Sequence, residues 1–509
     1  MIIFIFWRVG KLLNCYFRGA KTNYVMITFT LALFFLIGGY FIYGRFVERI
    51  FKPDVNQKTP AYTKADGVDY LVLPNWKIFM IQFLNIAGLG PIFGAIMGAQ
   101  FGTASYLWIV FGTIFAGAVH DFFSGALSLR HDGESLPELI GRYLGDRTRK
   151  VMTVFSVVLM VLVGAVFISG PAELLAGMTP MWMNAYFWMI VIFVYYIMAT
   201  LCPVDKIIGR IYPLFAIALL FMAFGLLIAM FVNQPALPEM WEGFGTKYES
   251  GPIFPMMFIS IACGAISGFH ATQSPLMARC MKNEKQCRPI FYGAMVTEGI
   301  VALIWAAVAT YFFGKYGTEF MDENGTKATN VAAYVATHIS VEWLGTFGSI
   351  LAILGIVAAP ITSGDTALRS ARLMVADFFH LEQRGVAKRL MICVPLFCVT
   401  AGILCYSLAD AQGFKIIWRY FAWCNQTLSV FTLWAITVYL IRVKGNYFIT
   451  LVPALFMTCV CSTYICIAGE GFSLSPMVSY IIGGTCTLLA FVLFMIWYKK
   501  GEKTTYEKI

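Results

Sequence analysis

Ionisable side chains lie within or at the ends of apolar segments long enough to cross a bilayer, where a charge is costly without a partner or a function. Glu298 has no charged residue close by in its segment, 288–314, and is the strongest candidate to take up a proton. His120 and Asp121 end the segment 103–124 and could relay protons. The alternative for this pair is a solvated helix end that pairs with nearby basic loops.

A second group of oxygen-bearing side chains closes the apolar segment 344–368. Thr362, Ser363 and Asp365 stand within about two helical turns. Two hydroxyls and a carboxylate could bind Na⁺, or the desolvated carboxyl group could take up a proton. Asp365 also precedes Arg369 by four residues, a spacing that permits an ion pair. Both interpretations of Asp365 stay open, whereas a cation site is favoured for the two hydroxyls.

Glycine-rich runs interrupt two apolar segments, at Ile86 to Pro91 and at Ile261 to Gly268. A helix broken at membrane depth exposes backbone groups that are costly to bury unless they line a cavity or bind something. Two such breaks in corresponding places are typical of a transporter's central site. The alternative is close helix packing, because several of these glycines have GxxxG spacing. The residues predicted to line a substrate site are Asn85, Gly88, Gly90, Pro91, Gln100, Gly264, Ser267, Gly268, His270 and Gln273.

Half-helix ends indicate the chemistry that this site prefers. N–H groups at the positive end of a helix dipole attract a carboxylate, and freed carbonyls attract cations. We therefore expect an anionic or zwitterionic small-molecule substrate, with H⁺ or Na⁺ as the coupling ion and no other cofactor. The thirteen cysteines include no CxxC pair, so we expect no metal. Motifs of the HExxH, GxSxG and Walker type are absent, which argues against an enzyme.

Membrane-spanning helices must position these residues. The chain has 509 residues, of which 59% are hydrophobic and 13% charged, and its mean hydropathy is +0.75. These values predict an all-α membrane protein with about thirteen transmembrane helices. The predicted spans are 24–44, 76–98, 103–124, 150–177, 182–201, 207–232, 254–278, 288–314, 344–368, 389–408, 413–440, 446–467 and 475–498.

Basic residues alternate from loop to loop. The loops at 45–75, 126–150, 202–210, 276–290, 369–390 and 441–446 and the tail from 499 carry 27 Lys and Arg, whereas the opposite loops carry 5. The positive-inside rule assigns the first set to the cytoplasm. Membrane orientation thus accounts for the net charge of +10, and we expect a lipid bilayer and no nucleic acid as partner.

Five spans begin with the first broken segment and five with the second, which predicts two repeats of opposite orientation. We expect an N-terminal helix and cytoplasmic linker at 1–75, a first five-helix repeat at 76–232, an external loop at 233–253, a second five-helix repeat at 254–440, and two C-terminal helices with a basic tail at 441–509. The acidic loops at 233–253 and 315–343 are predicted to be external and could gate access.

Four stretches of the chain resemble the carbon starvation protein A family of bacterial peptide and pyruvate transporters. The resemblance runs from about Tyr43 to Arg372 and recurs near Asn425. The stretches are Asp66-Gly67-Val68-Asp69-Tyr70, Ile86 to Pro91 with Ala99-Gln100, Gly117 to Phe122, and Ile261 to His270.

The resemblance implies a multi-pass inner-membrane secondary transporter of the amino acid–polyamine–organocation superfamily, linked to carbon starvation. It implies a leucine-transporter-type fold of two inverted five-helix repeats, with one extra N-terminal and two extra C-terminal helices here. In that fold a sodium site uses an Ala-x-x-Thr-Ser pattern, which Ala359, Thr362 and Ser363 match in spacing. Family members often carry a His-His pair where this chain has Ile81 and Gln82. We therefore expect import of short peptides or pyruvate-like carboxylates; a channel-like or sensory protein for small nutrients is the alternative.

Overall fold

The computed structural model describes residues 26–67, 69–201, 204–248, 251–317, 330–381, 386–409 and 413–501. Within these ranges the chain is all-helical and has no β-strand. The expectations for residues 1–25 and for the end of the basic tail, 502–509, lie outside the described residues.

The helices follow one another in a single long series. In chain order they are α2 (Ile27–Phe51), α3 (Pro60–Thr63), α4 (Asn75–Ile86), α5 (Ala95–Ala99), α6 (Ala104–Gly112), α7 (Ala118–Arg130), α8 (Leu136–Leu144), α9 (Asp146–Ala176), α10 (Ala185–Leu201), α11 (Val204–Asn233), α12 (Ile253–Ser260), α13 (Gly268–Ala278), α14 (Gly293–Tyr316), α15 (Val331–Phe378), α16 (Val386–Ala409), α17 (Gly413–Arg442), α18 (Phe448–Ile467) and α19 (Pro476–Gly501). Short π-helical turns, η1 (Gly90–Gly94), η2 (Thr113–Gly117) and η5 (Arg288–Tyr292), precede α5, α7 and α14.

Most of these helices have the length and composition of membrane spans. Within the described residues, ten pass on both criteria, and the bent pair α4 and η1–α5 brings the number to eleven. Helix α10 is apolar but shorter. The predicted total of thirteen crossings, which counts α10 and the broken pair α12–α13, stays a prediction.

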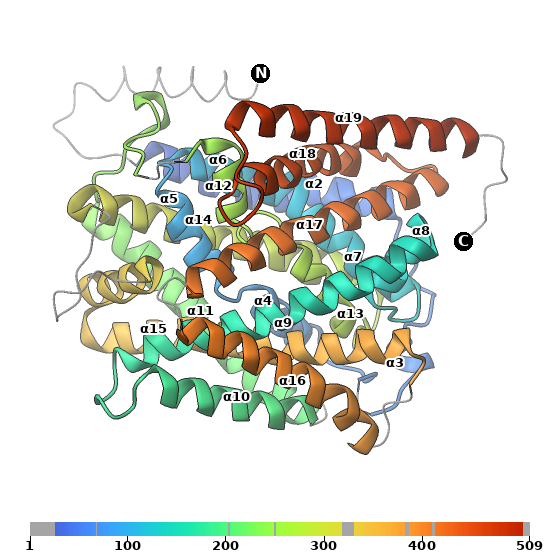
Figure 1. Ribbon diagram of the computed structural model, residues 1–509, viewed down its shortest axis with the longest axis horizontal. Helices are drawn as coiled ribbons and strands as arrows, with labels where there is room; N and C mark the ends of the chain where they lie inside the picture. Colours follow the sequence, from blue (N-terminus) through green and yellow to red (C-terminus); the bar gives the residue numbers. More distant parts are fainter. Residues whose placement is uncertain are drawn as a thin grey trace.

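The broken helices lie among the other spans. Helix α13 contacts α4, α7 and α17, and α4 in turn contacts α11, α14 and α15. In Figure 1 the labels of α4, α9 and α13 lie near the middle of the view, with α19 along one edge and α10 and α16 along the opposite edge. This arrangement places the two breaks among protein neighbours, where freed backbone groups can find partners.

Both predicted breaks are present. The first span bends by 53° between α4 and Gly90–Ala99, after Ala87 leaves helical geometry with ψ at 49°. Pro91 then follows, and a proline cannot donate to a helical ladder. In the second span α12 ends at Ser260, and α13 begins only at Gly268, after Ser267 in extended geometry.

One predicted boundary was wrong. The segment expected to end at 124 continues as α7 to Arg130, because Ala126–Leu129 pack into the core and Gly125 lies against the Phe291 ring. The loop expected at 315–343 contains the first part of α15, which begins at Val331, where the Asn330 side chain accepts a hydrogen bond from the Ala333 N–H. Helix α15 is kinked at Gly345, which has a φ of 65°, close to the predicted start of the membrane span at 344.

Candidate functional site

The two breaks contact each other directly. A Cβ added to Gly90 would lie 2.1 Å from the Cys263 Cβ, and one added to Gly94 would lie 2.9 Å from the Ser260 carbonyl oxygen. A Cβ on Gly264 would in turn approach the backbone of Pro91. The close-packing interpretation of the glycines is therefore correct for these contacts, and it holds together with the breaks rather than instead of them.

Helix α17 supplies the hydrogen bonds that the second break needs. The Asn425 Oδ1 accepts from the Phe269 N–H at 2.7 Å and from the Ser267 hydroxyl at 3.0 Å. The Gln426 Nε2 donates to the carbonyls of Ala262 and Ile266, both at 2.9 Å. Asn425 therefore caps the N-terminus of α13, the end that the sequence predicts would attract a substrate carboxylate.

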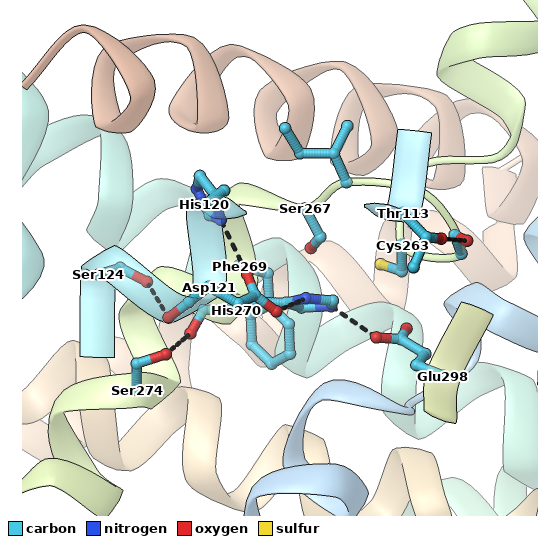
Figure 2. A network of polar contacts seen from close by, with 12 residues as sticks. Thr113, His120, Asp121, Ser124, Cys263, Ser267, Phe269, His270, Ser274 and Glu298 are labelled. Carbon is cyan, nitrogen blue, oxygen red and sulfur yellow. Dashed lines mark hydrogen bonds and ion pairs between the residues drawn. The ribbon is translucent and has the colours of Figure 1, made fainter. Parts of the chain in front are cut away.

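A chain of acidic and imidazole groups runs between three helices (Figure 2). The two oxygens of Asp121 on α7 lie 2.8 Å from the Nδ1 atoms of His120 and His270. The Nε2 of His270 on α13 lies 3.4 Å from the Glu298 Oε2 on α14. All four side chains are fully buried. Figure 2 shows His270 between the two carboxylates.

These contacts limit where protons can lie on the four side chains. Asp121 accepts from both imidazoles when each carries its proton on Nδ1, which leaves both Nε2 atoms as acceptors. The His270 Nε2 and the Glu298 Oε2 lie 3.4 Å apart and can share a hydrogen bond when one of them carries a proton. No arginine or lysine in the described part of the chain pairs with either carboxylate. The arrangement carries net charge −1 with that shared proton, and a second proton neutralises it.

The structure joins residues that the sequence interpretation kept apart. His270 is predicted to line the substrate site, whereas His120, Asp121 and Glu298 are predicted for coupling, yet they form one connected chain. The solvated alternative for His120 and Asp121 is wrong, because α7 continues past them and both are fully buried.

Beside the first break, buried amide groups lack partners. Gln82 and Asn85 lie on the last turn and a half of α4 and are fully buried, and neither their oxygen nor their nitrogen atoms bond to any described residue. Unsatisfied buried polar groups are rare in native proteins and call for an explanation, such as a ligand or water. Asn85 is a predicted site residue, whereas Gln82 is not; its position one turn before Asn85 was the available signal.

The hydroxyl pair on α15 lies at the first break. The Ser363 Oγ donates at 2.9 Å to the Leu84 carbonyl and is 3.0 Å from the Ala359 carbonyl. The Thr362 Oγ1 is 2.8 Å from that same Ala359 carbonyl. Gly88 lies beside Ser363, since a Cβ there would come 3.3 Å from its Oγ. Carbonyl and hydroxyl oxygens are suitable Na⁺ ligands, and of the three predicted residues Ser363 contacts the first break, whereas the Thr362 hydroxyl bonds within α15. The cation site at Ala359, Thr362 and Ser363 stays a prediction.

Asp365 faces a different partner. Its Oδ2 accepts a 2.8 Å hydrogen bond from the Tyr212 hydroxyl of α11, which also donates to the Thr362 carbonyl. The side chain is fully buried and therefore lies in the interior rather than at a solvated helix end. Asp365 is thus near the hydroxyl pair along α15 but is not part of the chain formed by Asp121, His270 and Glu298.

The remaining predicted residues occupy the edges of this region. Gln273 is buried on α13, and its Nε2 donates to the Thr272 hydroxyl. Gln100 lies just beyond α5, where its carbonyl accepts from the Tyr248 N–H of the loop 234–248. That loop therefore covers the end of the first broken span, as an external gate would.

A charged network closes the end of the molecule that carries the basic loops. The Arg130 guanidinium lies 3.0 Å from both oxygens of Glu284 and donates to the Lys52 carbonyl and the Tyr439 hydroxyl. Glu284 also accepts from the Asp54 N–H. These contacts tie α2, α7, α17 and the loop after α13 together, and no local sequence pattern indicates them.

Comparisons with known proteins place this geometry in a family. The family model of carbon starvation protein CstA matches residues 23–186, 172–341 and 315–464. An uncharacterized membrane protein of Haemophilus influenzae is 44% identical over 57% of this chain and 91% of its own length. The peptide transporter CstA of Campylobacter jejuni is 27% identical over 86% of this chain and 79% of its own. The pyruvate/proton symporter BtsT of Escherichia coli is 28% identical over 52% and 46%.

Solved structures show the fold. The transporter MhsT in complex with L-phenylalanine aligns with a TM-score of 0.56 at 11% identity, over 83% of this chain and 98% of its own. The Eremococcus coleocola manganese transporter aligns with a TM-score of 0.53 at 12% identity, over 85% and 97%. At these identities the likeness is one of fold, the leucine-transporter type. With the family model matching almost all of residues 23–464, this chain belongs to the carbon starvation protein CstA family and is a multi-pass transporter of the bacterial inner membrane.

Proposed function

We propose that this chain is a secondary active transporter that imports a short peptide or a small carboxylate such as pyruvate together with protons. Its working parts would be two inverted five-helix repeats at 76–232 and 254–440, with the substrate held near the two breaks. The relatives named as a peptide transporter and as a pyruvate/proton symporter support both substrate classes and the coupling ion.

The observation that carries the proposal is the buried chain of Asp121, His270 and Glu298. Net charge inside a membrane protein is costly, so the site favours the state in which a second proton has neutralised it. Its three members come from α7, α13 and α14, and the middle one stands two residues after the second break. A proton taken up here would therefore favour one arrangement of the break over another.

The substrate would bind at the first break. The N-terminus of α13 is already capped by Asn425, whereas the two side-chain amides of Gln82 and Asn85 leave four polar atoms without a described partner. Carboxamide groups both donate and accept, which suits the carboxylate and amide groups of a peptide and the two carbonyl functions of pyruvate. Closure would then exclude water, since both side chains are fully buried.

Sodium coupling is the second candidate, and the convergence of oxygens around Ser363 favours it. The Ser363 hydroxyl lies within hydrogen-bonding distance of the carbonyls of Leu84 and Ala359, and the Thr362 hydroxyl lies within hydrogen-bonding distance of the Ala359 carbonyl. A Na⁺ ion at this place would bridge α15 to the first broken helix, so that ion binding and closure of the break would occur together.

Uptake into proteoliposomes tests the proposal. We expect pyruvate or a dipeptide to accumulate above equilibrium when the outside is acidic, and a protonophore to abolish this. A parallel arm replaces the pH gradient with a sodium gradient at equal pH on both sides. Equilibration without accumulation in both arms would instead indicate the channel-like alternative. Absence of uptake of both substrates in every arm would refute the transport proposal.

A further inference from the structure

We propose that the groove between α2, α4 and α14 binds an anionic phospholipid of the cytoplasmic leaflet, with one acyl chain along α14 and the phosphate at the start of α4. The groove has a volume of about 450 Å³. That volume falls in the range of about 300–1,000 Å³ that is usual for ligand pockets. This inference does not depend on which substrate the transporter carries.

The position of the groove fits an acyl chain. Its walls are three helices with membrane-span composition, and Ile37, Phe41 and Trp76 stand 40, 50 and 56% exposed along it. The wall on η5 and α14 runs from Pro289 to Ile300. These twelve residues are separated by eleven rises of about 1.5 Å, which make about 16 Å. Half of a hydrocarbon core of about 30 Å is about 15 Å, so the groove extends through one leaflet.

The side-chain amides that line the groove lie at one of its ends. Asn75 and Gln286 line the end beside the loops 45–75 and 276–290, which the positive-inside rule assigns to the cytoplasm. The Asn75 Oδ1 is buried and has no hydrogen-bond partner among the described residues. The opposite end is lined by Val296, Thr297 and Ile300, and the Thr297 hydroxyl there bonds to the Gly293 carbonyl of its own helix. A molecule with a polar head and an apolar tail matches this gradient, whereas a uniformly polar substrate does not.

Basic residues are close in sequence to the residues that line the polar end, Asn75 and Gln286. Lys77 lies over the Trp76 ring, with its Nζ 5.7 Å from the ring centroid, and Lys282 and Lys285 are exposed on the adjoining loop. None of the three forms an ion pair with a described residue. Arg288 beside them is different, because its Nε is 2.8 Å from Glu48. Three uncompensated ammonium groups at the membrane surface attract a phosphate, which selects an anionic lipid over a zwitterionic one.

The test measures lipid retained by the delipidated full-length protein in detergent, by native mass spectrometry, after addition of phosphatidylglycerol or phosphatidylethanolamine with matched chains. We expect the wild type to retain phosphatidylglycerol in preference. The single variants Lys77→Gln and Lys285→Gln should each weaken this retention about five-fold. This factor is equivalent to about 1 kcal/mol per basic residue near the headgroups. The control Lys150→Gln, which removes a lysine paired with Asp146, should leave retention unchanged.

A groove-filling variant separates this site from general attraction to the surface. Thr297→Phe places a ring between the walls and should abolish retention of both lipids, and Ile300→Trp does the same if the first variant folds poorly. Equal retention of the two lipids by the wild type, or unchanged retention in both filling variants, overturns the proposal. Loss of a dimer in Thr297→Phe with lipid retention unchanged would also overturn it, since the groove would then be an interface between copies.

Discussion

Removal of the Asn425 side chain should loosen the second break by a calculable amount. Asn425→Ala leaves the buried Phe269 N–H and the buried Ser267 hydroxyl without their acceptor. An orphaned buried donor costs about 1–3 kcal/mol, so two of them should lower the free energy of unfolding by about 2–4 kcal/mol when partial relaxation is allowed for. The effect acts on the N-terminus of α13, two residues before His270.

Thermal unfolding of the purified protein gives the measurement. The unfolding entropy of about 2.1 cal/mol/K per residue amounts to about 1.1 kcal/mol/K for 509 residues, so the midpoint should fall by about 2–4 °C. Initial uptake should fall by at least about ten-fold, because His270 loses its position. Asn425→Asp keeps the Oδ1 acceptor of both hydrogen bonds and should recover most of both losses. Thr432→Val is the matched control, since the Thr432 hydroxyl bonds only within its own helix. A variant Asn425→Ala that matched this control in both measurements would refute the capping role.

Three further substitutions test other parts of the site. Glu298→Gln should retain substrate exchange at equal pH but lose the substrate accumulation that a pH gradient drives. In the wild type this accumulation is about ten-fold per pH unit for one proton per substrate. Accumulation at the wild-type level in the variant would exclude Glu298 from the coupling path. In the sodium arm, Ser363→Ala should raise the Na⁺ concentration for half-maximal uptake at least about ten-fold by removing one oxygen ligand; an unchanged value excludes Ser363 as a ligand. Gly90→Ala should lower the thermal midpoint because its Cβ overlaps Cys263, and adding Cys263→Gly should restore part of it; a midpoint equal to that of the wild type would contradict the close contact.

Local sequence features were sufficient to predict the two breaks and the helices around them. Gly88, Gly90 and Pro91 disfavour a continuous helix, and so do the glycines of the second run. The positions of the two breaks therefore follow from the backbone preferences of these residues. The hydroxyl pair at Thr362 and Ser363 was also predictable, because it depends on spacing within one helix.

Contacts between distant segments were not predictable in this way. His270 follows Asp121 by 149 residues, and which helix face meets which is decided by packing that no local pattern reveals. Asn425 could serve as a cap only once α17 lay against the second break. The burial of His120 was missed for a related reason: the predicted span ended at 124, whereas Gly125 lies against the Phe291 ring and α7 continues to Arg130.

The place of His270 next to a break has a thermodynamic consequence. The imidazole contacts Asp121 and Glu298, and the Phe269 N–H of the same helix bonds to Asn425 beside the break, so under the proposed function protonation and the geometry of the break would be coupled. If protonation changes the affinity of the break for its substrate by some factor, then bound substrate must change the affinity for the proton by that same factor. The reason is that the binding free energies around a thermodynamic cycle sum to zero. A single titration of proton uptake against substrate concentration would therefore measure the coupling free energy from either side.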